Sequence, residues 1–112
     1  MTKSIRIYDW QYSGEPAERG GYEPGREDNT LDFLAEQSIT ANLYSGQGDF
    51  LWFHGDGVLL HINTSWQNYG SEGRKIHRYL TVQIQPPNAA LPKELSDFIE
   101  EKGFKQIDAI KK

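Results

Sequence analysis

One hairpin constrains the fold of this chain more than any other feature. Residues 50–63 form two apolar runs on either side of Asp56-Gly57. This dipeptide favours a two-residue type I′ turn, because both central residues of that turn need a positive φ, which Asp and Gly tolerate. The turn predicts that Gly55 lies opposite Val58, and it sets the register of both strands.

A hairpin in this register has two unlike faces. One face carries hydrocarbon side chains and predicts a core, with Phe53 opposite Leu60 and Leu51 opposite Ile62. The other face mixes aromatic, imidazole and amide groups, with His54 opposite Leu59, Trp52 opposite His61 and Phe50 opposite Asn63. This second composition is typical of a surface that contacts something.

Hydrophobic periodicity divides the rest of the chain. Alternation with a period of two predicts strands at 3–12, 38–45 and 76–85, and a short edge strand at 105–110. Helical spacing predicts a short helix near 30–37 and an amphipathic helix over 92–102, which Gly103 ends and Phe104 follows with an apolar contact. Glycine, proline and polar residues predict loops at 13–29 and 64–75.

These elements predict an α+β fold of two layers. We expect an antiparallel sheet of four to five strands, with the C-terminal helix packed on its aliphatic face. The aliphatic face would hold ten side chains, namely Ile5, Ile7, Leu51, Phe53, Val58, Leu60, Ile62, Leu80, Val82 and Ile84. The opposite face would gather all three histidines with aromatic residues, namely Tyr8, Trp10, Trp52, His54, His61, His77 and Tyr79.

Length and composition narrow the class of protein. A chain of 112 residues predicts a single domain. The chain has no cysteine, which excludes disulfides, thiolate metal sites and cysteine catalysis. No apolar run approaches the ~20 residues of a membrane-spanning helix, and the N-terminus shows no signal-peptide pattern, so we expect a soluble, cytoplasmic protein.

The charge is unevenly distributed along the chain. Residues 1–56 hold ten acidic and four basic residues, a net charge of −6, and residues 57–112 carry a net charge of +2. Nucleic-acid binding needs a basic surface, and single-strand platforms need basic residues among the aromatic ones, so this balance disfavours it. It favours a basic partner or plain solubility.

Histidines on one face raise the alternative of an enzyme or a metal-binding protein. His61 would then act as a base, with Asp9 or Asp56 orienting it and Thr64 or Ser65 as nucleophile. A zinc ion between His54 and His61 would take a further ligand from His77 or a carboxylate. No known ligand or catalytic spacing is present, so we expect no metal, no cofactor and no catalysis.

Protein binding asks for less special chemistry. Large, rigid aromatic side chains are enriched at interfaces, and an acidic loop beside them would steer a basic partner. The sequence therefore favours a protein-binding module, foremost an immunity or inhibitor protein that blocks a basic toxin or nuclease domain. The expected partner-binding residues are Tyr8, Trp10, Trp52, His54, His61, Trp66, Tyr79, Glu23, Glu27 and Asp28. The alternative that loop 13–29 folds over the aromatic face and buries it stays open.

Overall fold

The computed structural model describes residues 6–14, 29–44, 47–69 and 75–111. These residues form one six-stranded antiparallel sheet in the order β2-β3-β4-β5-β1-β6. The strands are β1 (Arg6–Gly14), β2 (Thr40–Tyr44), β3 (Gln47–Gly55), β4 (Val58–Tyr69), β5 (Lys75–Gln85) and β6 (Lys105–Lys111). The fold is therefore α+β, as expected, although the sheet has six strands where four to five were predicted.

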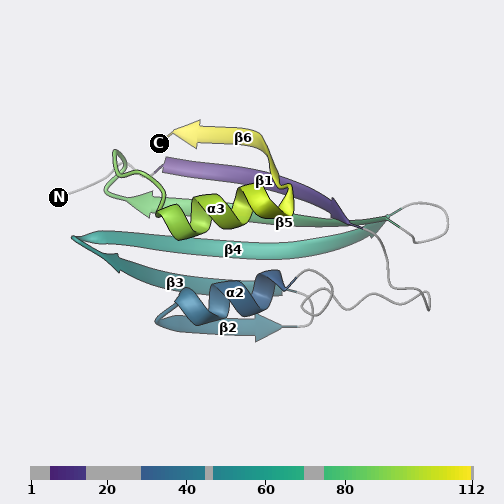
Figure 1. The fold of residues 1–112 in the computed structure, drawn as a ribbon, viewed down its shortest axis with the longest axis horizontal. Coiled ribbons are helices and arrows are strands. Elements are labelled where there is room, and N and C mark those ends of the chain that lie inside the picture. The colour runs from purple at the N-terminus through teal and green to yellow at the C-terminus, as the bar shows by residue number, and fades with distance from the viewer. Residues whose placement is uncertain (1–5, 15–28, 45–46, 70–74, 112) are drawn as a thin grey trace.

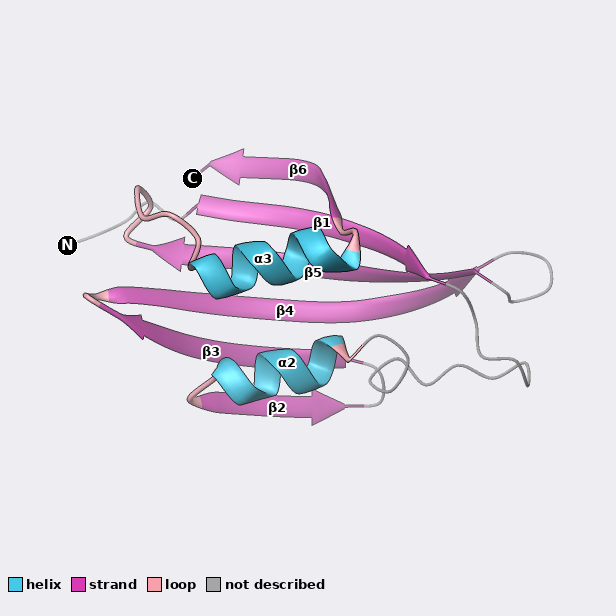
Figure 2. Cartoon of the chain, in the orientation of Figure 1, coloured by secondary structure: helices cyan, strands magenta, loops and turns pink. Residues whose placement is uncertain are grey.

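Two helices of the described chain, α2 (Thr30–Gln37) and α3 (Lys93–Lys102), lie over the same face of the sheet (Figures 1 and 2). We call this the helix face and the opposite side the open face. After β1 the chain reaches the far edge of the sheet at β2 and returns by a meander to β5. The first strand thus lies inside the sheet, between β5 and β6.

Both helices were predicted, and their local chemistry explains their bounds. Helix α2 follows Asn29, which takes a left-handed conformation, and it buries Leu31 and Leu34. Helix α3 follows Pro92 and buries the predicted stripe of Leu95, Phe98 and Ile99. Gly103 ends α3 at φ 83°, where its N–H bonds back to carbonyls of the last turn. Phe104 is buried beside Phe98, with 6.3 Å between ring centroids.

The β3–β4 hairpin has the predicted turn but a different register. Asp56 and Gly57 both have positive φ, and Gly55 pairs with Val58. A β-bulge then inserts His54, so that Phe53 pairs with Leu59. One extra residue reverses which side chains of β3 face the helices. The predicted placement of Leu51 and Phe53 in the core, and of Trp52 and His54 on the opposite face, is therefore wrong.

Strand β1 is also reversed relative to the prediction. Trp10 is 6% exposed and Tyr8 packs against the core, both on the helix face. Ile7, which pairs with Gln83 on the open face, is only half-buried. Both alternating sets of β1 contain large apolar residues, although Asp9 and Gln11 belong to the set of Ile7, and the set that is buried is the aromatic one. Ile5 lies outside the described residues.

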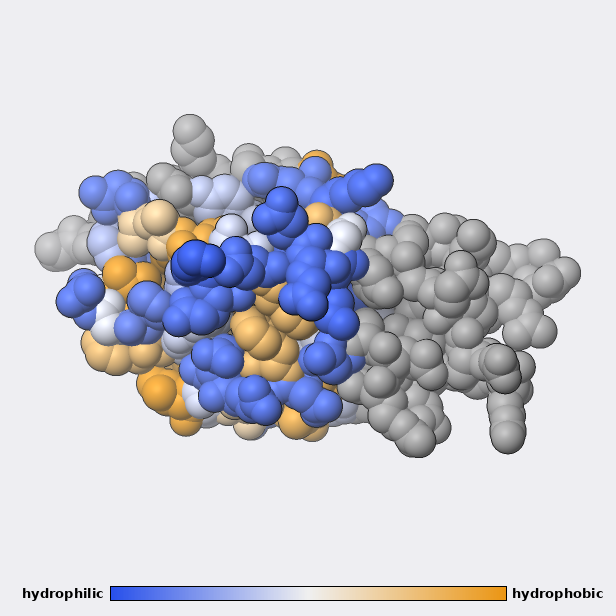
Figure 3. Space-filling model, in the orientation of Figure 1, coloured by the Kyte–Doolittle hydropathy of each residue, from blue (hydrophilic) through white to orange (hydrophobic). Residues whose placement is uncertain are grey.

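The core lies between the helices and the sheet. Five of its six predicted members on β4 and β5 are fully buried, namely Leu60, Ile62, Leu80, Val82 and Ile84. The sixth, Val58, is partly buried and packs against them. Phe50 and Trp52 join them from β3. Phe33 of α2 stacks on Phe98 of α3, with 4.1 Å between ring centroids, and an apolar patch is visible between the two helices (Figure 3). The rest of that face is mostly hydrophilic.

The remaining difference concerns the predicted loop at 64–75. Most of this segment is strand, because β4 continues to Tyr69 and β5 begins at Lys75. Arg78 and Thr64 are buried at neighbouring positions, and Nη1 of Arg78 donates to Oγ1 of Thr64 at 3.3 Å. Of the predicted loop 13–29, residues 15–28 lie outside the described residues, and so do the acids Glu23, Glu27 and Asp28.

Candidate binding face

The open face is the surface that the two helices leave uncovered. Cross-strand register brings its polar side chains into one row across the sheet, formed by Asn42, Asp49, Asn63, Thr81 and Asp9. Directly paired residues on neighbouring strands lie about 4.5–5.5 Å apart, so these side chains can bond to one another. Five of the six strands thus contribute to one polar surface.

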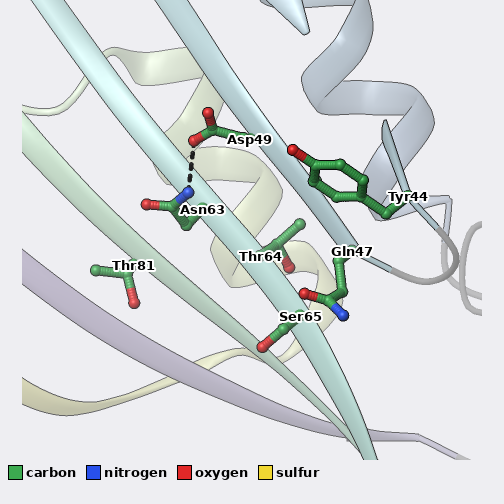
Figure 4. A pocket seen from close by; sticks show the side chains of 8 residues that line it. Tyr44, Gln47, Asp49, Asn63, Thr64, Ser65 and Thr81 are labelled. Atoms are coloured by element: carbon green, nitrogen blue, oxygen red, sulfur yellow. Dashed lines mark hydrogen bonds between the residues drawn. The ribbon is translucent and has the colours of Figure 1, made fainter. Parts of the chain in front are cut away.

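Asp49 is the centre of this row. Its Oδ1 atom lies 2.7 Å from Nε2 of His61 and accepts a hydrogen bond from Nδ2 of Asn63 (Figure 4). The side chains of His61 and Asp49 are 39% and 37% exposed, so the group remains in contact with solvent. Further along the row, Thr81 donates to Oδ1 of Asp9 at 2.7 Å. The two carboxylates are each held in place by a neighbouring strand.

A shallow polar depression of about 320 Å³ borders this row (Figure 4). Its lining residues come from β2 to β5 and are Tyr44, Gln47, Gly48, Asp49, Asn63, Thr64, Ser65 and Thr81. Its surroundings are flat sheet, and Tyr44 at its edge is 60% exposed. It is a recess in a broad surface and does not enclose a ligand.

An apolar area adjoins the polar row on the side of the β3–β4 turn. Phe53 and Leu59 pair across the two strands, and Leu51 lies on the same face next to His61. Phe53 is 53% exposed, so about half of its surface faces solvent on this side of the sheet. Leu51, Leu59 and His61 also line a second depression of about 220 Å³ with two glutamines of β5. The open face therefore combines an apolar area with a polar one.

Only part of the predicted site lies on this face. His61 and Tyr79 belong to the open face, as predicted. Trp10 and Trp52 are buried in the core, Tyr8 packs against it, and Trp66, which pairs with Arg78, also belongs to the helix face. Burial removes the two tryptophans from any surface that a partner could touch. The expected aromatic face does not form.

The expected histidine face does not form either. His54 lies on the helix face, where Nε2 is 3.5 Å from Oε1 of Glu94 and the ring contacts Trp52. His61 lies on the other side of the sheet, so the two imidazoles cannot bind one metal ion. The side chain of His77 is outside the described part of the chain. Among the described residues, no group of three or more His, Cys, Asp or Glu residues could hold a metal ion.

The pair of Asp49 and His61 was not predicted, although it resembles the orienting half of a general-base system. A catalytic use would need a nucleophile at the ring. Among the described side chains, no hydroxyl group bonds to His61, whose hydrogen-bond partner is Asp49. The signal that could have revealed the pair is Gly55, because a glycine just before a tight turn is typical of a bulge.

No known protein family matches this chain, and no curated protein or solved structure is significantly similar to it. We therefore infer its function from its own residues. No helix within the described ranges has the length and apolar character needed to cross a membrane.

Proposed function

We propose that this protein is a binding module, without catalysis, that covers a basic surface of another protein with the open face of its sheet. The observation that carries this proposal is the apolar area of Leu51, Phe53 and Leu59 on the uncovered side of the sheet, beside the polar row centred on Asp49. An apolar centre next to hydrogen-bonding groups is the usual composition of a protein interface. An immunity or inhibitor protein would use such a face to block a toxin or nuclease.

The dimensions of the open face favour a protein over a small ligand. Six strands about 4.8 Å apart, with inner strands of 9 to 12 residues, give a face of roughly 25 by 30 Å. This corresponds to roughly 750 Å², close to the ~800 Å² that each partner contributes to a standard protein interface. The two shallow depressions are features of this surface and do not dominate it.

Charge supports a basic partner. On the four inner strands, the carboxylates described on the open face are those of Asp9 and Asp49, and His61 is the hydrogen-bond partner of Asp49. Lys105 lies at the β6 edge. A toxin or nuclease that binds phosphate groups presents a positive surface, so acids on this face would speed its association and exclude acidic proteins.

The test compares two equally exposed apolar side chains. Phe53 on the open face is 53% exposed and Ile107 on the β6 edge is 51% exposed. A partner captured from the native host by the immobilised protein is identified by mass spectrometry, and its dissociation constant is measured by surface plasmon resonance at two salt concentrations. We expect Phe53→Asp to weaken binding at least tenfold, as loss of a buried interface anchor does, while Ile107→Asp binds like the parent.

The proposal also predicts how binding responds to salt. Association with a basic partner should slow as the ionic strength rises, because acids on the open face attract it. A partner whose binding is unchanged by Phe53→Asp, or whose association is insensitive to salt, would contradict the use of this face. Loss of binding in Ile107→Asp alone would move the interface to the β6 edge.

A further inference from the structure

The two edges of the sheet differ in their protection against pairing with another strand. Strand β6 carries Lys105 and Lys111, and a register shift interrupts its pairing with β1. Charged residues and bulges are the usual means by which an edge strand avoids adding a further strand. Strand β2 has the sequence Thr-Ala-Asn-Leu-Tyr, with no charge, no proline and an unbroken register against β3. All of its residues are exposed, so β2 is an unprotected edge among the strands that the structure describes.

We propose that a second copy of this chain pairs with this edge through its own β2, antiparallel about a two-fold axis at Asn42. In this register Asn42 lies opposite Asn42 of the second copy, Ala41 opposite Leu43 and Thr40 opposite Tyr44. Each pair joins positions that differ by zero, two or four residues. The N–H and C=O groups of successive residues point to opposite edges of a strand, so residues separated by an even number point to the same edge. In this register, residues whose N–H and C=O point away from β3 therefore lie opposite residues of the second copy that do the same. The described residues offer no other strand on this side of β2.

The side chains of β2 complement those of β2 in the second copy. A small residue stands opposite a large one in both flanking pairs, Ala41 with Leu43 and Thr40 with Tyr44. Leu43 and Tyr44 are 53% and 60% exposed and would gain cover. At the axis, an asparagine amide is both donor and acceptor, so two copies can bond to each other.

The absence of charge on β2 favours a second copy over a strand from another protein. A two-fold axis brings each residue near its own copy, so any charge close to the axis would repel itself. Asn42 is neutral, and the charged residues of the sheet edges lie on β6. The pairing would join the open faces of both copies into one surface. It is tested separately from the proposed function, because it is measured as self-association of the purified chain, whereas open-face binding is measured through Phe53 of β3. Asn42 and Tyr44 belong to both surfaces, so binding to another protein is not judged from their variants.

Sedimentation velocity of four proteins tests this pairing. A five-residue strand makes a weak interface, so the parent chain is followed up to roughly 1 mM, where we expect a shift from monomer to dimer. Asn42→Lys and Asn42→Glu should each remain monomeric at this concentration, since like charges would meet at the axis. An equimolar mixture of the two should regain the dimer, because opposite charges then meet. Gln106→Lys, an exposed change on the β6 edge, should dimerise like the parent.

Circular dichroism melts establish that each variant is folded before it is compared. A parent chain that stays monomeric at 1 mM would overturn the proposal. So would folded Asn42 variants that dimerise as well as the parent, or a mixture of them that remains monomeric, because the two-fold register at Asn42 requires rescue. None of these results bears on Phe53, so failure here and failure of open-face binding are distinguishable.

Discussion

The reversed register of β3 predicts that Trp52 matters far more to stability than its neighbour Phe53. An aromatic side chain buries about 150–250 Å² when it is enclosed. Trp52 is 4% exposed, so its replacement by alanine removes nearly all of this burial, an upper estimate of about 5 kcal/mol at 25 cal/mol per Å². Phe53 has a smaller ring and is 53% exposed, so it buries less than half of this area, which leaves an upper estimate of roughly 2 kcal/mol. We expect Trp52→Ala to lower the free energy of unfolding by about 3–5 kcal/mol and Phe53→Ala by about 1 kcal/mol.

Urea unfolding followed by circular dichroism measures both changes in one buffer. The midpoint should fall while the slope m stays constant, which shows that stability has changed and the unfolded state has not. If Trp52→Ala unfolds the chain outright, Trp52→Phe supplies a milder change at the same position. A larger loss for Phe53→Ala than for Trp52→Ala would refute the bulge and restore the regular hairpin register.

Three further predictions follow from particular contacts. Gly48→Ala should destabilise the fold by about 1–3 kcal/mol in the same urea assay, because a Cβ there would lie 2.5 Å from the buried ring of Phe50 and 3.1 Å from Leu31. Leu60→Ala and Phe98→Ala should each cost about 2–5 kcal/mol, since both side chains are buried in the core. The pKa of Lys93 is raised, first by its hydrogen bond to the Asp97 carboxylate and second by the negative charge of that carboxylate. Asp97→Asn should therefore lower that pKa in an NMR titration, and the bond should be lost in the parent as pH rises through the raised value.

The sequence predicted the elements whose signals are local. Helix α3 is bounded by Pro92 and Gly103, which act through their own backbone preferences, and its buried stripe follows from helical spacing alone. The turn at Asp56-Gly57 has the same origin, since both residues take the required positive φ. The buried faces of β4 and β5 could be predicted because one alternating set in each is mostly aliphatic and the other is mostly polar. In all these cases, the residues that determine the local structure lie within one short segment of the sequence.

The faces of β1 and β3 could not be predicted in this way, because each alternating set in these strands includes large apolar side chains. The choice of Phe50 and Trp52 over Leu51 and Phe53 depends on what packs above the sheet, and Phe33 of α2 meets Trp52 there with 6.4 Å between ring centroids. That contact is absent from any local pattern. The candidate site inherited the error, since Asp49 reaches His61 and Asn63 only in the bulged register.

The bulge in β3 yields the last prediction, because it consists of a single extra residue. Phe53 pairs with Leu59 and Gly55 with Val58, so His54 is the residue without a direct partner in the ladder. Deleting His54 would make these two pairs consecutive and leave a regular two-residue hairpin, with Trp52 still opposite Leu60. The lost contact with Glu94 joins two exposed side chains and contributes little. We expect the variant to fold with a stability within about 1 kcal/mol of the parent.

Deletion of Leu51 is the matched control, since it removes one residue from the same strand at a paired position. The strand would then have to place either Phe50 or Trp52 on the wrong face, and a one-residue slip of this kind exposes the buried set. We expect this variant to be unfolded or strongly destabilised in urea. If the two deletions lowered the free energy of unfolding equally, His54 would not be a dispensable extra residue. Its contact with Glu94 on the helix face would then contribute to the stability of the fold.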